Sequence, residues 1–258
     1  MAEEGKKAEG KAERKEERKI SAGSYDLNRL LYGGYDKDII TTIYGPAGSG
    51  KTNFCLLAAV SQAKKGNKVI FIDTEGGFSI ERVKQISAES YEDVLKNIIL
   101  LKPVNFDEQK KAFSTLVSEI KGKGKIGLIV VDGMTMLYRL ELSEASQAKN
   151  DDMVRQTNSE LARQMRILAE IARLKNIPVI VTNQVYSEFL SDEDFRSGKE
   201  RAVNMVGGDI LRYWSKCLLE LQNDRGRRKL IIRKHRSLPE KEMAFVITNE
   251  GVRRRGWM

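Results

Sequence analysis

Short, continuously apolar segments recur along the chain and are separated by longer polar or amphipathic stretches. Such segments of strand length occupy residues 38–44, 68–73, 97–101, 126–132 and 178–184. They are rich in valine and isoleucine and do not alternate with polar residues, which is typical of strands buried on both faces of a parallel sheet. The pattern therefore predicts a buried, mainly parallel sheet.

The stretches between these strands favour helices. Residues 52–65 follow the first strand directly, and residues 106–121 are amphipathic. In residues 152–176, apolar side chains recur every three or four positions, as on one face of a helix. Strands that alternate with helices at this spacing indicate βαβ units, so we expect an α/β fold with a doubly wound sheet.

The last part of the chain has a different pattern. Three short apolar runs at residues 216–222, 228–233 and 243–248 are separated by turns that are too short to contain helices. Closely spaced strands of this kind pair antiparallel. We therefore predict a C-terminal antiparallel meander that extends the sheet.

Composition divides the chain into two parts. Residues 1–22 are rich in lysine, glutamate, alanine and glycine and contain no aromatic residue, which predicts a disordered charged tail. Residues 23–258 have the mixed pattern of one packed domain. We expect no segment before this domain that is long or apolar enough to form a second one.

Several classes of protein are disfavoured by the sequence. It contains no apolar run of about twenty residues and no N-terminal signal sequence, so we expect no membrane span and a cytoplasmic location. Cys55 and Cys217 lie far apart, which suits a reducing compartment. With a single histidine, His235, a zinc site or a histidine-based catalytic triad is not expected.

The net charge of +9 is concentrated near the C-terminus. Residues 212–258 contain thirteen lysines and arginines against five acidic residues. A local surplus of this size favours a polyanionic partner such as nucleic acid, although a solvated basic surface would have the same composition.

The segment GPAGSGKT fits the phosphate-loop pattern G-x-x-x-x-G-K-[ST], and it lies between a predicted strand and a predicted helix. Backbone N–H groups of such a loop surround phosphate oxygens at a helix N-terminus. Lys51 would bridge the β- and γ-phosphates of ATP, and Thr52 would supply its hydroxyl to Mg²⁺. The alternative is a glycine-rich turn with a surface lysine. The residues expected around the nucleotide are Gly45, Pro46, Ala47, Gly48, Ser49, Gly50, Lys51, Thr52 and Asn53.

Polar side chains follow three other predicted strands and should lie at the same edge of the sheet. Asp132 ends an apolar strand and could serve the metal, or could belong to an ordinary turn. Glu75 could polarise a water molecule, although Asp73 or Glu75 could equally form a turn before two glycines. Gln184 could sense a γ-phosphate, or could be a turn residue at the end of its strand.

Together these segments resemble the RecA-type ATPases. The similar stretches include GPAGSGKTN, VIFIDTEGGFSIERV, LIVVDGMTMLYR, IPVIVTNQVYSEF, GGDILRYWSK and RKHRSLP, in this order. The resemblance implies a phosphate-loop ATPase core in which Glu75 is the catalytic carboxylate. Lys51 and Gln184 would act beside it in catalysis. It also implies Asp132 as the second metal-binding residue, reaching Mg²⁺ through water.

Three further side chains gain a role from the resemblance. Arg82 would pack against adenine, although a helix-surface arginine is the alternative. Lys234 and Arg236 would reach the γ-phosphate bound by a neighbouring subunit. DNA phosphate contact and a solvated basic end of a strand stay open for this segment, and His235 could simply pack the turn.

The resemblance places DNA at two loops, near residues 139–155 and 186–206. The second loop contains Arg196, Lys199 and Arg201, but its acidic residues make its net charge negative. The basic stretch of Arg225, Arg227, Arg228 and Lys229 is therefore the stronger electrostatic candidate, with a solvated hairpin tip as the alternative.

These features predict an ATP-binding and DNA-binding accessory protein of homologous recombination and DNA repair, with weak ATP hydrolysis. The expected partners are DNA, bound mainly as single strands without sequence specificity, and a recombinase of the RadA type. Self-association is also expected, although the missing N-terminal docking segment disfavours filaments. The pair Tyr213-Trp214 could form an interface between subunits, but such aromatic pairs are more often buried in the core. The alternatives are a full DNA-dependent strand-exchange recombinase and a RecA-like signalling ATPase that does not bind DNA.

Overall fold

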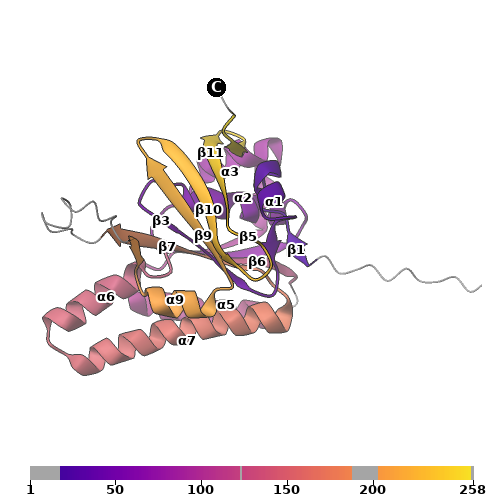
Figure 1. The fold of residues 1–258 in the computed structure, drawn as a ribbon. Helices are drawn as coiled ribbons and strands as arrows, with labels where there is room; N and C mark the ends of the chain where they lie inside the picture. The colour runs from indigo at the N-terminus through magenta and orange to yellow at the C-terminus, as the bar shows by residue number, and fades with distance from the viewer. Residues whose placement is uncertain (1–17, 123, 188–202, 257–258) are drawn as a thin grey trace, which may run out of the picture.

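The computed structural model describes residues 18–122, 124–187 and 203–256, and its centre is one large mixed sheet (Figure 1). The strands lie in the order β12-β11-β10-β9-β3-β7-β6-β4-β5, and the pairs from β9 to β5 are parallel. The parallel strands predicted from the sequence are β3 (Ile40–Gly45), β4 (Lys68–Asp73), β5 (Ile98–Leu101), β6 (Ile126–Asp132) and β7 (Val179–Ser187).

The C-terminal strands form the predicted antiparallel meander. They are β9 (Cys217–Asp224), β10 (Arg227–His235), β11 (Lys241–Thr248) and β12 (Gly251–Arg254). The pattern had predicted only three of them, because β12 is four residues long and half of it is arginine. The turn between β9 and β10 consists of Arg225 and Gly226, both with positive φ, as two-residue hairpin turns require.

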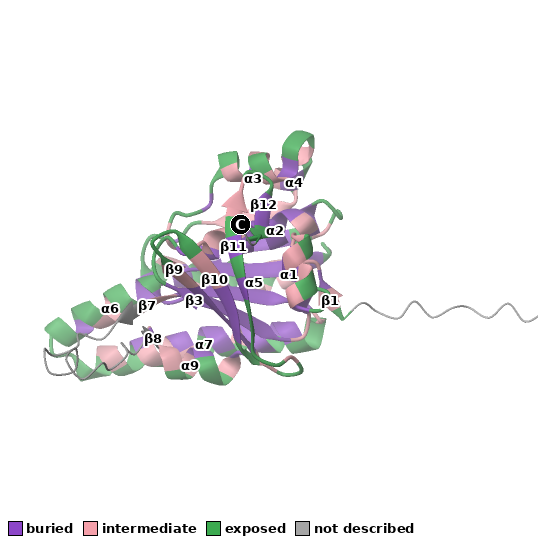
Figure 2. Ribbon diagram, turned by 45° about the horizontal axis from the view of Figure 1, so that its top comes forward, coloured by how far each residue is buried: buried purple, intermediate pink, exposed green. Residues whose placement is uncertain are grey.

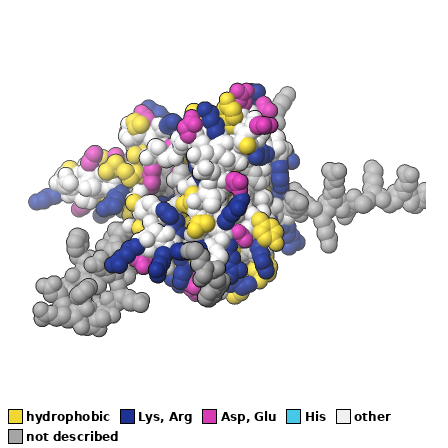
Figure 3. All heavy atoms as spheres, turned by 90° about the horizontal axis from the view of Figure 1, so that it is seen from above, with side chains coloured by type: hydrophobic (Ala, Val, Ile, Leu, Met, Phe, Trp, Pro, Cys, Tyr) yellow, Lys and Arg dark blue, Asp and Glu magenta, His cyan; other side chains and the backbone are white. Residues whose placement is uncertain are grey.

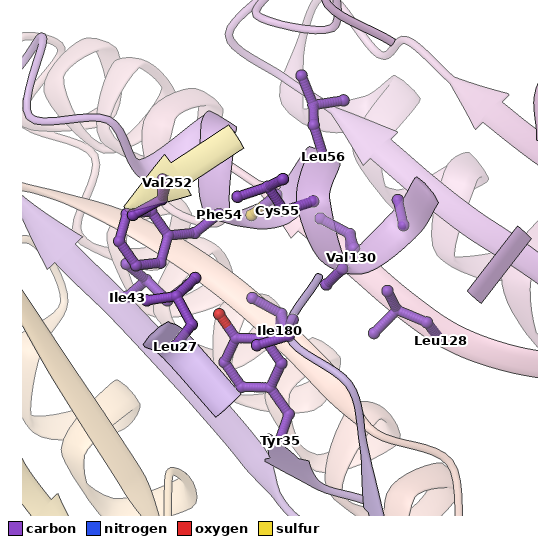
Figure 4. Close-up of a cluster of buried hydrophobic side chains, with 14 of the residues drawn as sticks. Leu27, Tyr35, Ile43, Phe54, Cys55, Leu56, Leu128, Val130, Ile180 and Val252 are labelled. Carbon is purple, nitrogen blue, oxygen red and sulfur yellow. The ribbon is translucent and has the colours of Figure 1, made fainter. Parts of the chain in front are cut away.

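Helices cover both faces of the sheet and enclose two separate cores (Figures 1 and 2). In β6, Leu128 and Val130 join the core beneath α2 (Lys51–Ala63), whereas Ile129 and Val131 join the core beneath α7 (Asp151–Lys175). This explains why the strands are continuously apolar: each face meets a different helix layer. Figure 4 shows part of the first core, where side chains of α2 meet those of β3, β6 and β7. The predicted doubly wound α/β fold is confirmed.

The two longest helices, α5 (Phe106–Lys121) and α7, each begin where an asparagine side chain accepts a backbone hydrogen bond. The Asn105 side chain accepts a hydrogen bond from the Glu108 N–H at the start of α5. Asn150 likewise caps α7 through the Met153 N–H, and Asn176 ends that helix in the left-handed conformation. Such caps replace hydrogen bonds that the helix itself cannot supply.

The remaining elements are short. They are β1 (Lys19–Ile20), α1 (Tyr25–Leu30), β2 (Tyr35–Asp36), α3 (Ile80–Ser87), η1 (Ala88–Ser90), α4 (Tyr91–Lys96), α6 (Met136–Gln147), β8 (Val203–Met205) and α9 (Gly208–Trp214). In the described part of the chain, no helix has the length and apolar character needed to cross a membrane.

Three sequence-based expectations are corrected here. Residues 139–155 are not a loop, because they form most of α6 and the start of α7. Packing begins before residue 23, since β1 pairs with β2 and Ala22 is fully buried. Tyr213 is not a core residue: it is 72% exposed, and its ring meets Trp214 edge to face.

Candidate functional site

The phosphate loop connects β3 to α2 and is seated on the C-terminal meander. Gly48 and Gly50 have φ values of 70° and 108°, which side chains disfavour. A Cβ atom on Gly45 would lie 2.3 Å from the Leu221 carbonyl oxygen of β9, and one on Gly50 would lie 2.9 Å from Ile247 of β11. The loop therefore needs glycine both for its conformation and for its close contact with these strands.

Lys51 begins α2 and is buried in the loop. Its Nζ donates hydrogen bonds to the carbonyl oxygens of Gly45 and Pro46, each at 3.0 Å. Burial lowers the pKa of the amine, while the nearby carboxylates of Glu75 and Asp132 act in the opposite direction. The cation thus lies at the mouth of a helix N-terminus, where phosphate groups bind in other loops of this sequence pattern.

Asp132 is held at the end of β6 with one oxygen satisfied and the other without a partner. Oδ1 accepts a hydrogen bond of 2.7 Å from the Thr182 hydroxyl, whereas Oδ2 is buried with no hydrogen-bond partner among the described residues. A Cβ on Gly77 would lie 3.1 Å from the Thr52 hydroxyl and 3.5 Å from Oδ2, so both oxygens face this glycine. Burial raises the pKa of Asp132, while the hydroxyl groups of Thr182 and Thr52 act in the opposite direction. The Thr52 hydroxyl is therefore near the carboxylate, although it makes no hydrogen bond of normal geometry to Oδ2.

These oxygens fit a Mg²⁺ ion. Mg²⁺ prefers oxygen ligands and is usually held by one or two carboxylates together with phosphates and waters. The Ser49 hydroxyl in the loop is also buried without a partner in the described structure. Because buried polar atoms are normally satisfied, the two unpartnered oxygens of Ser49 and Asp132 indicate a place for a polar ligand.

Glu75 and Gln184 meet across the same sheet edge. The Gln184 amide nitrogen donates a hydrogen bond of 3.0 Å to Oε2 of Glu75. Asp73 has the turn-forming role that the sequence left open, since its carboxylate accepts hydrogen bonds from the N–H groups of Gly77 and Phe78. Glu75 is therefore directed toward the candidate site and does not form this turn.

Sequence reasoning missed the residues that support this pair. Asn183 accepts a hydrogen bond from Thr135 and donates one of 2.7 Å to the Val206 carbonyl oxygen, next to β8. Thr182 also accepts the Gly133 N–H, which fixes the turn after β6. The signal in the sequence is the polar run Thr-Asn-Gln at the end of an otherwise apolar strand.

Arg82 is more than a surface arginine. Its guanidinium donates to the Asn53 side chain at 2.8 Å and to the Thr248 carbonyl oxygen at 2.8 Å. Further bonds reach Gln85 and the Asn249 carbonyl oxygen, and burial lowers the pKa of the group. Arg82 thus joins α3, the start of α2 and the end of β11, beside the phosphate loop.

The basic hairpin between β9 and β10 lies against the phosphate loop. Side-chain nitrogens of Asn223 and Arg228 are 3.4 and 3.5 Å from the Gly48 carbonyl oxygen. Lys229 is bound to the Glu242 carboxylate, while Arg225 and Arg227 are exposed. Seen from above, positively charged side chains gather along one side of the molecule (Figure 3). The other predicted DNA contacts, Arg196, Lys199 and Arg201, lie outside the described residues.

Lys234 is engaged within its own subunit. A β-bulge between Ile232 and Lys234 interrupts the simple alternation of side chains expected along β10. The Lys234 amine donates to the carbonyl oxygens of Arg212 and Ser215, both at 2.9 Å. It therefore caps the C-terminus of α9, a position that favours a cation.

Arg236 and His235 enclose a buried carboxylate. Arg236 forms two hydrogen bonds of 2.7 Å with Asp38, which holds the Asp38 pKa below its usual value. The His235 ring nitrogen Nε2 and the Arg236 Nε each lie 3.3 Å from Asp36, which is buried. Nδ1 of His235 accepts the N–H groups of Ser237 and Leu238, so this ring packs the turn.

The geometry thus places the phosphate-loop segment, two carboxylates and the Gln184 amide at one sheet edge. The Rad51 family profile matches residues 13–255. The chain belongs to the Rad51 family. The resemblance to RecA-type ATPases is thereby confirmed.

The curated relatives include several archaeal proteins named "DNA repair and recombination protein RadB". The protein from Methanobrevibacter smithii is 40% identical to this Rad51-family chain over 230 residues, which cover 88% of this chain and 92% of the relative. Those from Methanococcus maripaludis strain C7 and Methanocaldococcus jannaschii are also 40% identical, covering 88% of this chain and 96% and 98% of the relatives.

Proposed function

We propose that this Rad51-family chain is an ATP-binding and DNA-binding accessory protein of homologous recombination and DNA repair. Its relatives are named as DNA repair and recombination proteins, and its fold is that of the family. The proposal rests chiefly on the unpartnered Oδ2 of Asp132, which faces the Thr52 hydroxyl beside the phosphate loop. A buried carboxylate oxygen in this place is best explained by a metal and a nucleotide that satisfy it.

In the proposed site, Thr52 and Asp132 would hold Mg²⁺, with Asp132 acting through a water molecule. The bound ion would offset negative charge on the phosphate oxygens. Backbone N–H groups at the start of α2 would receive the phosphates. Lys51 would exchange its bonds to the Gly45 and Pro46 carbonyl oxygens for bonds to phosphate, which are stronger because both groups are charged.

Glu75 and Gln184 support a slow, regulated hydrolysis. Glu75 is placed to orient a water molecule, but its Oε2 is bound to Gln184. A γ-phosphate that attracted the Gln184 amide would release this carboxylate and would also move the strand that Asn183 ties to Val206. The nucleotide would in this way act mainly as a conformational ligand.

The C-terminal contacts favour an accessory protein over a motor. A finger that completes a neighbour's site needs a free cation, whereas Lys234 and Arg236 are both bound within the subunit. Releasing them would cost the contacts that hold α9 and β2 in place. The exposed Arg225 and Arg227 are suited to phosphates of DNA, bound without base specificity, beside the nucleotide loop. The protein would then assist a recombinase of the RadA type.

ATP turnover per subunit, measured against protein concentration with and without single-stranded DNA, tests this function. We expect a low rate that depends little on concentration and that Lys51→Ala abolishes. Single-strand affinity should change when ATP is added to the wild type, but not when it is added to Lys51→Ala. A rate that rises steeply with concentration, and that Lys234→Ala or Arg236→Ala flattens, would instead establish an assembling ATPase.

A further inference from the structure

A cavity lined with lysines lies at the opposite edge of the sheet from the phosphate loop. It has a volume of about 570 Å³ and is formed where β6 and β7 begin, beside β1 and the end of α7 (on the right in Figure 1). Its lining includes Lys19, Lys37, Lys65, Lys125 and Lys175. No acidic residue is among the described residues that line it.

Among the residues that the structure describes, most of these lysines have no anionic partner. In the described ranges, Lys19 alone among them lies within 4 Å of a carboxylate, at 3.7 Å from Asp36. The side chains of Lys65, Lys125 and Lys175 are exposed around the cavity. Lysines that serve only solubility are usually interspersed with acidic residues, and here such residues are missing from the lining.

Helix termini explain some of this charge but not all of it. The helices α2, α5 and α7 all end at this edge, and a helix C-terminus carries roughly half a negative charge. Three such ends amount to about one and a half negative charges, and Asp36 contributes one more beside Lys19. Five lysines exceed this sum, so the cavity keeps a positive surplus.

A buried amide lines the same cavity, and its nitrogen has no hydrogen-bond partner in the described part of the chain. Gln62 is 2% exposed, and its side-chain oxygen accepts a hydrogen bond from Asn67 at 3.0 Å. Its Nε2 has no hydrogen-bond partner among the described residues. An N–H donor without an acceptor beside several ammonium groups is suited to an anion with several oxygens, as a phosphate group is.

We propose that this lysine cavity binds the phosphate backbone of duplex DNA. Lysine is a point charge that contacts phosphate without reading bases. Proteins that hold single strands also use aromatic side chains on which bases stack, and none of the described residues lining the cavity is aromatic. A duplex, whose bases are already stacked and whose phosphates face outward, fits this lining better than a single strand.

The proposal goes beyond the function proposed above and does not depend on the nucleotide. The cavity lies at the beginnings of the strands, whereas the phosphate loop and Asp132 lie at their ends. One molecule could thus hold a duplex at one edge while a single strand is bound near the nucleotide at the other. Duplex binding at the lysine cavity should therefore be the same with and without ATP, and in Lys51→Ala.

Fluorescence anisotropy with a short duplex of random sequence, measured without nucleotide at several salt concentrations, tests the proposal. The cavity variant carries Lys65→Ala, Lys125→Ala and Lys175→Ala, and the charge-preserving variant carries arginine at the same positions. A matched control carries Lys96→Ala, Lys102→Ala and Lys111→Ala, which removes three exposed lysines that do not line the cavity. All of the replaced side chains are exposed, so the fold should be retained, which thermal unfolding checks.

We expect the cavity variant to lose duplex affinity by at least about tenfold, and its salt dependence to weaken by roughly two to three released ions. The arginine variant should retain binding, and the control should change by only about twofold. A single strand of thymidines should be affected less than the duplex. Equal losses in the control, or unchanged duplex affinity in the cavity variant, would overturn the proposal.

Inorganic tripolyphosphate distinguishes a small anion from a polymer. If it binds the wild type tightly, and the cavity variant loses this binding but keeps its duplex affinity, the site takes a small phosphate ligand and the proposal is wrong. Weak competition by tripolyphosphate, together with the loss of duplex affinity, supports the duplex. A failure here leaves the ATP-dependent experiments untouched, because those depend on Lys51.

Discussion

Two regions of the molecule that contain cationic side chains differ in how their polar groups are satisfied. At the phosphate loop, Ser49 Oγ and Asp132 Oδ2 are buried without partners in the described structure. In the C-terminal basic cluster, Arg233 to Arg236, all four side chains have a partner within the subunit. Asp36 Oδ2, beside the basic cluster, also has no hydrogen bond among the described residues, but it lies 3.3 Å from nitrogens of His235 and Arg236. The two oxygens at the loop have no such ion pair in the described structure, so they are the ones left for a ligand to satisfy.

The comparison is tested most strongly by adding MgATP to variants of each region. At a hundred times the dissociation constant, a ligand that binds only the folded state stabilises it by about 2.7 kcal/mol. We expect this gain in the wild type and in Lys234→Ala, and its loss in Lys51→Ala. Thermal unfolding at several ATP concentrations, each with Mg²⁺ or with a chelator, provides the measurement.

Without ligand, Lys234→Ala should lower the free energy of unfolding more than Lys51→Ala does. Lys51 is only 6% exposed, so the cost of burying its charge offsets its two hydrogen bonds, and Lys51→Ala should change the unfolding free energy little. Lys234 is exposed and has a smaller burial cost. Lys234→Ala removes the bonds to the Arg212 and Ser215 carbonyl oxygens and should destabilise the protein by about 0.5–1 kcal/mol. If Lys234→Ala also lost the MgATP effect, the basic cluster would belong to the nucleotide site.

A double-mutant cycle on Arg236 and Asp38 measures how much this ion pair of the basic cluster contributes to the free energy of unfolding. The pair is partly exposed, and we expect a coupling energy of about 0.5–1 kcal/mol between Arg236→Gln and Asp38→Asn. Arg236→Gln alone should cost more than Asp38→Asn, because it also leaves the buried Asp36 with one cation fewer. Equal single effects with no coupling would mean that the two bonds contribute nothing to folding.

His235 gives the smallest effect, a change in the pH dependence of stability. Burial lowers its pKa in the folded state, against the pull of Asp36 and together with repulsion from Lys19 and Arg236. Below a pH of about 6.5, the unfolded chain therefore takes up a proton more readily than the folded one. The free energy of unfolding should decrease as the pH is lowered through this range.

Urea unfolding of His235→Gln between about pH 5 and 7 should show a flatter profile than that of the wild type. Since this is the only histidine in the chain, its NMR signal reports the same titration without ambiguity. Asp132, whose pKa burial raises, contributes the opposite slope at pH values just above the pKa of a free carboxyl group, so Asp132→Asn should steepen the profile at its acid end. A profile steeper in His235→Gln than in the wild type would show that the ring is charged when folded.

The strands of the sheet could be predicted because the hydrophobic pattern within each strand is sufficient to identify it. Residues 68–73, 126–132 and 106–121 form elements with the predicted bounds, since strand or helix periodicity was unbroken there. The expected loop at residues 139–155 was wrong because it came from the family resemblance, whereas the local sequence continues as a helix. The short β12 carries two arginines and gave no apolar run to find.

The phosphate loop was predictable for another reason, because its residues are contiguous. Contacts between distant residues were not. Arg236 and Asp38 are 198 positions apart, and the sequence around neither residue indicates that the two side chains form a pair. The lysines at positions 19, 37, 65, 125 and 175 are isolated in sequence, and only the topology, which brings the beginnings of several strands together, makes them neighbours.

The packing of the phosphate loop against β9 and β11 affects when this loop can fold during translation. Gly45 lies against the backbone of Leu221, and Gly50 against Ile247. A ribosome that has reached β7 has already synthesised every residue of the loop, but neither of these supports. At about 5–20 residues per second, the loop waits roughly 10–40 s before Ile247 is added. A nascent chain of this protein should therefore complete the packing of this loop only after β11 has been synthesised.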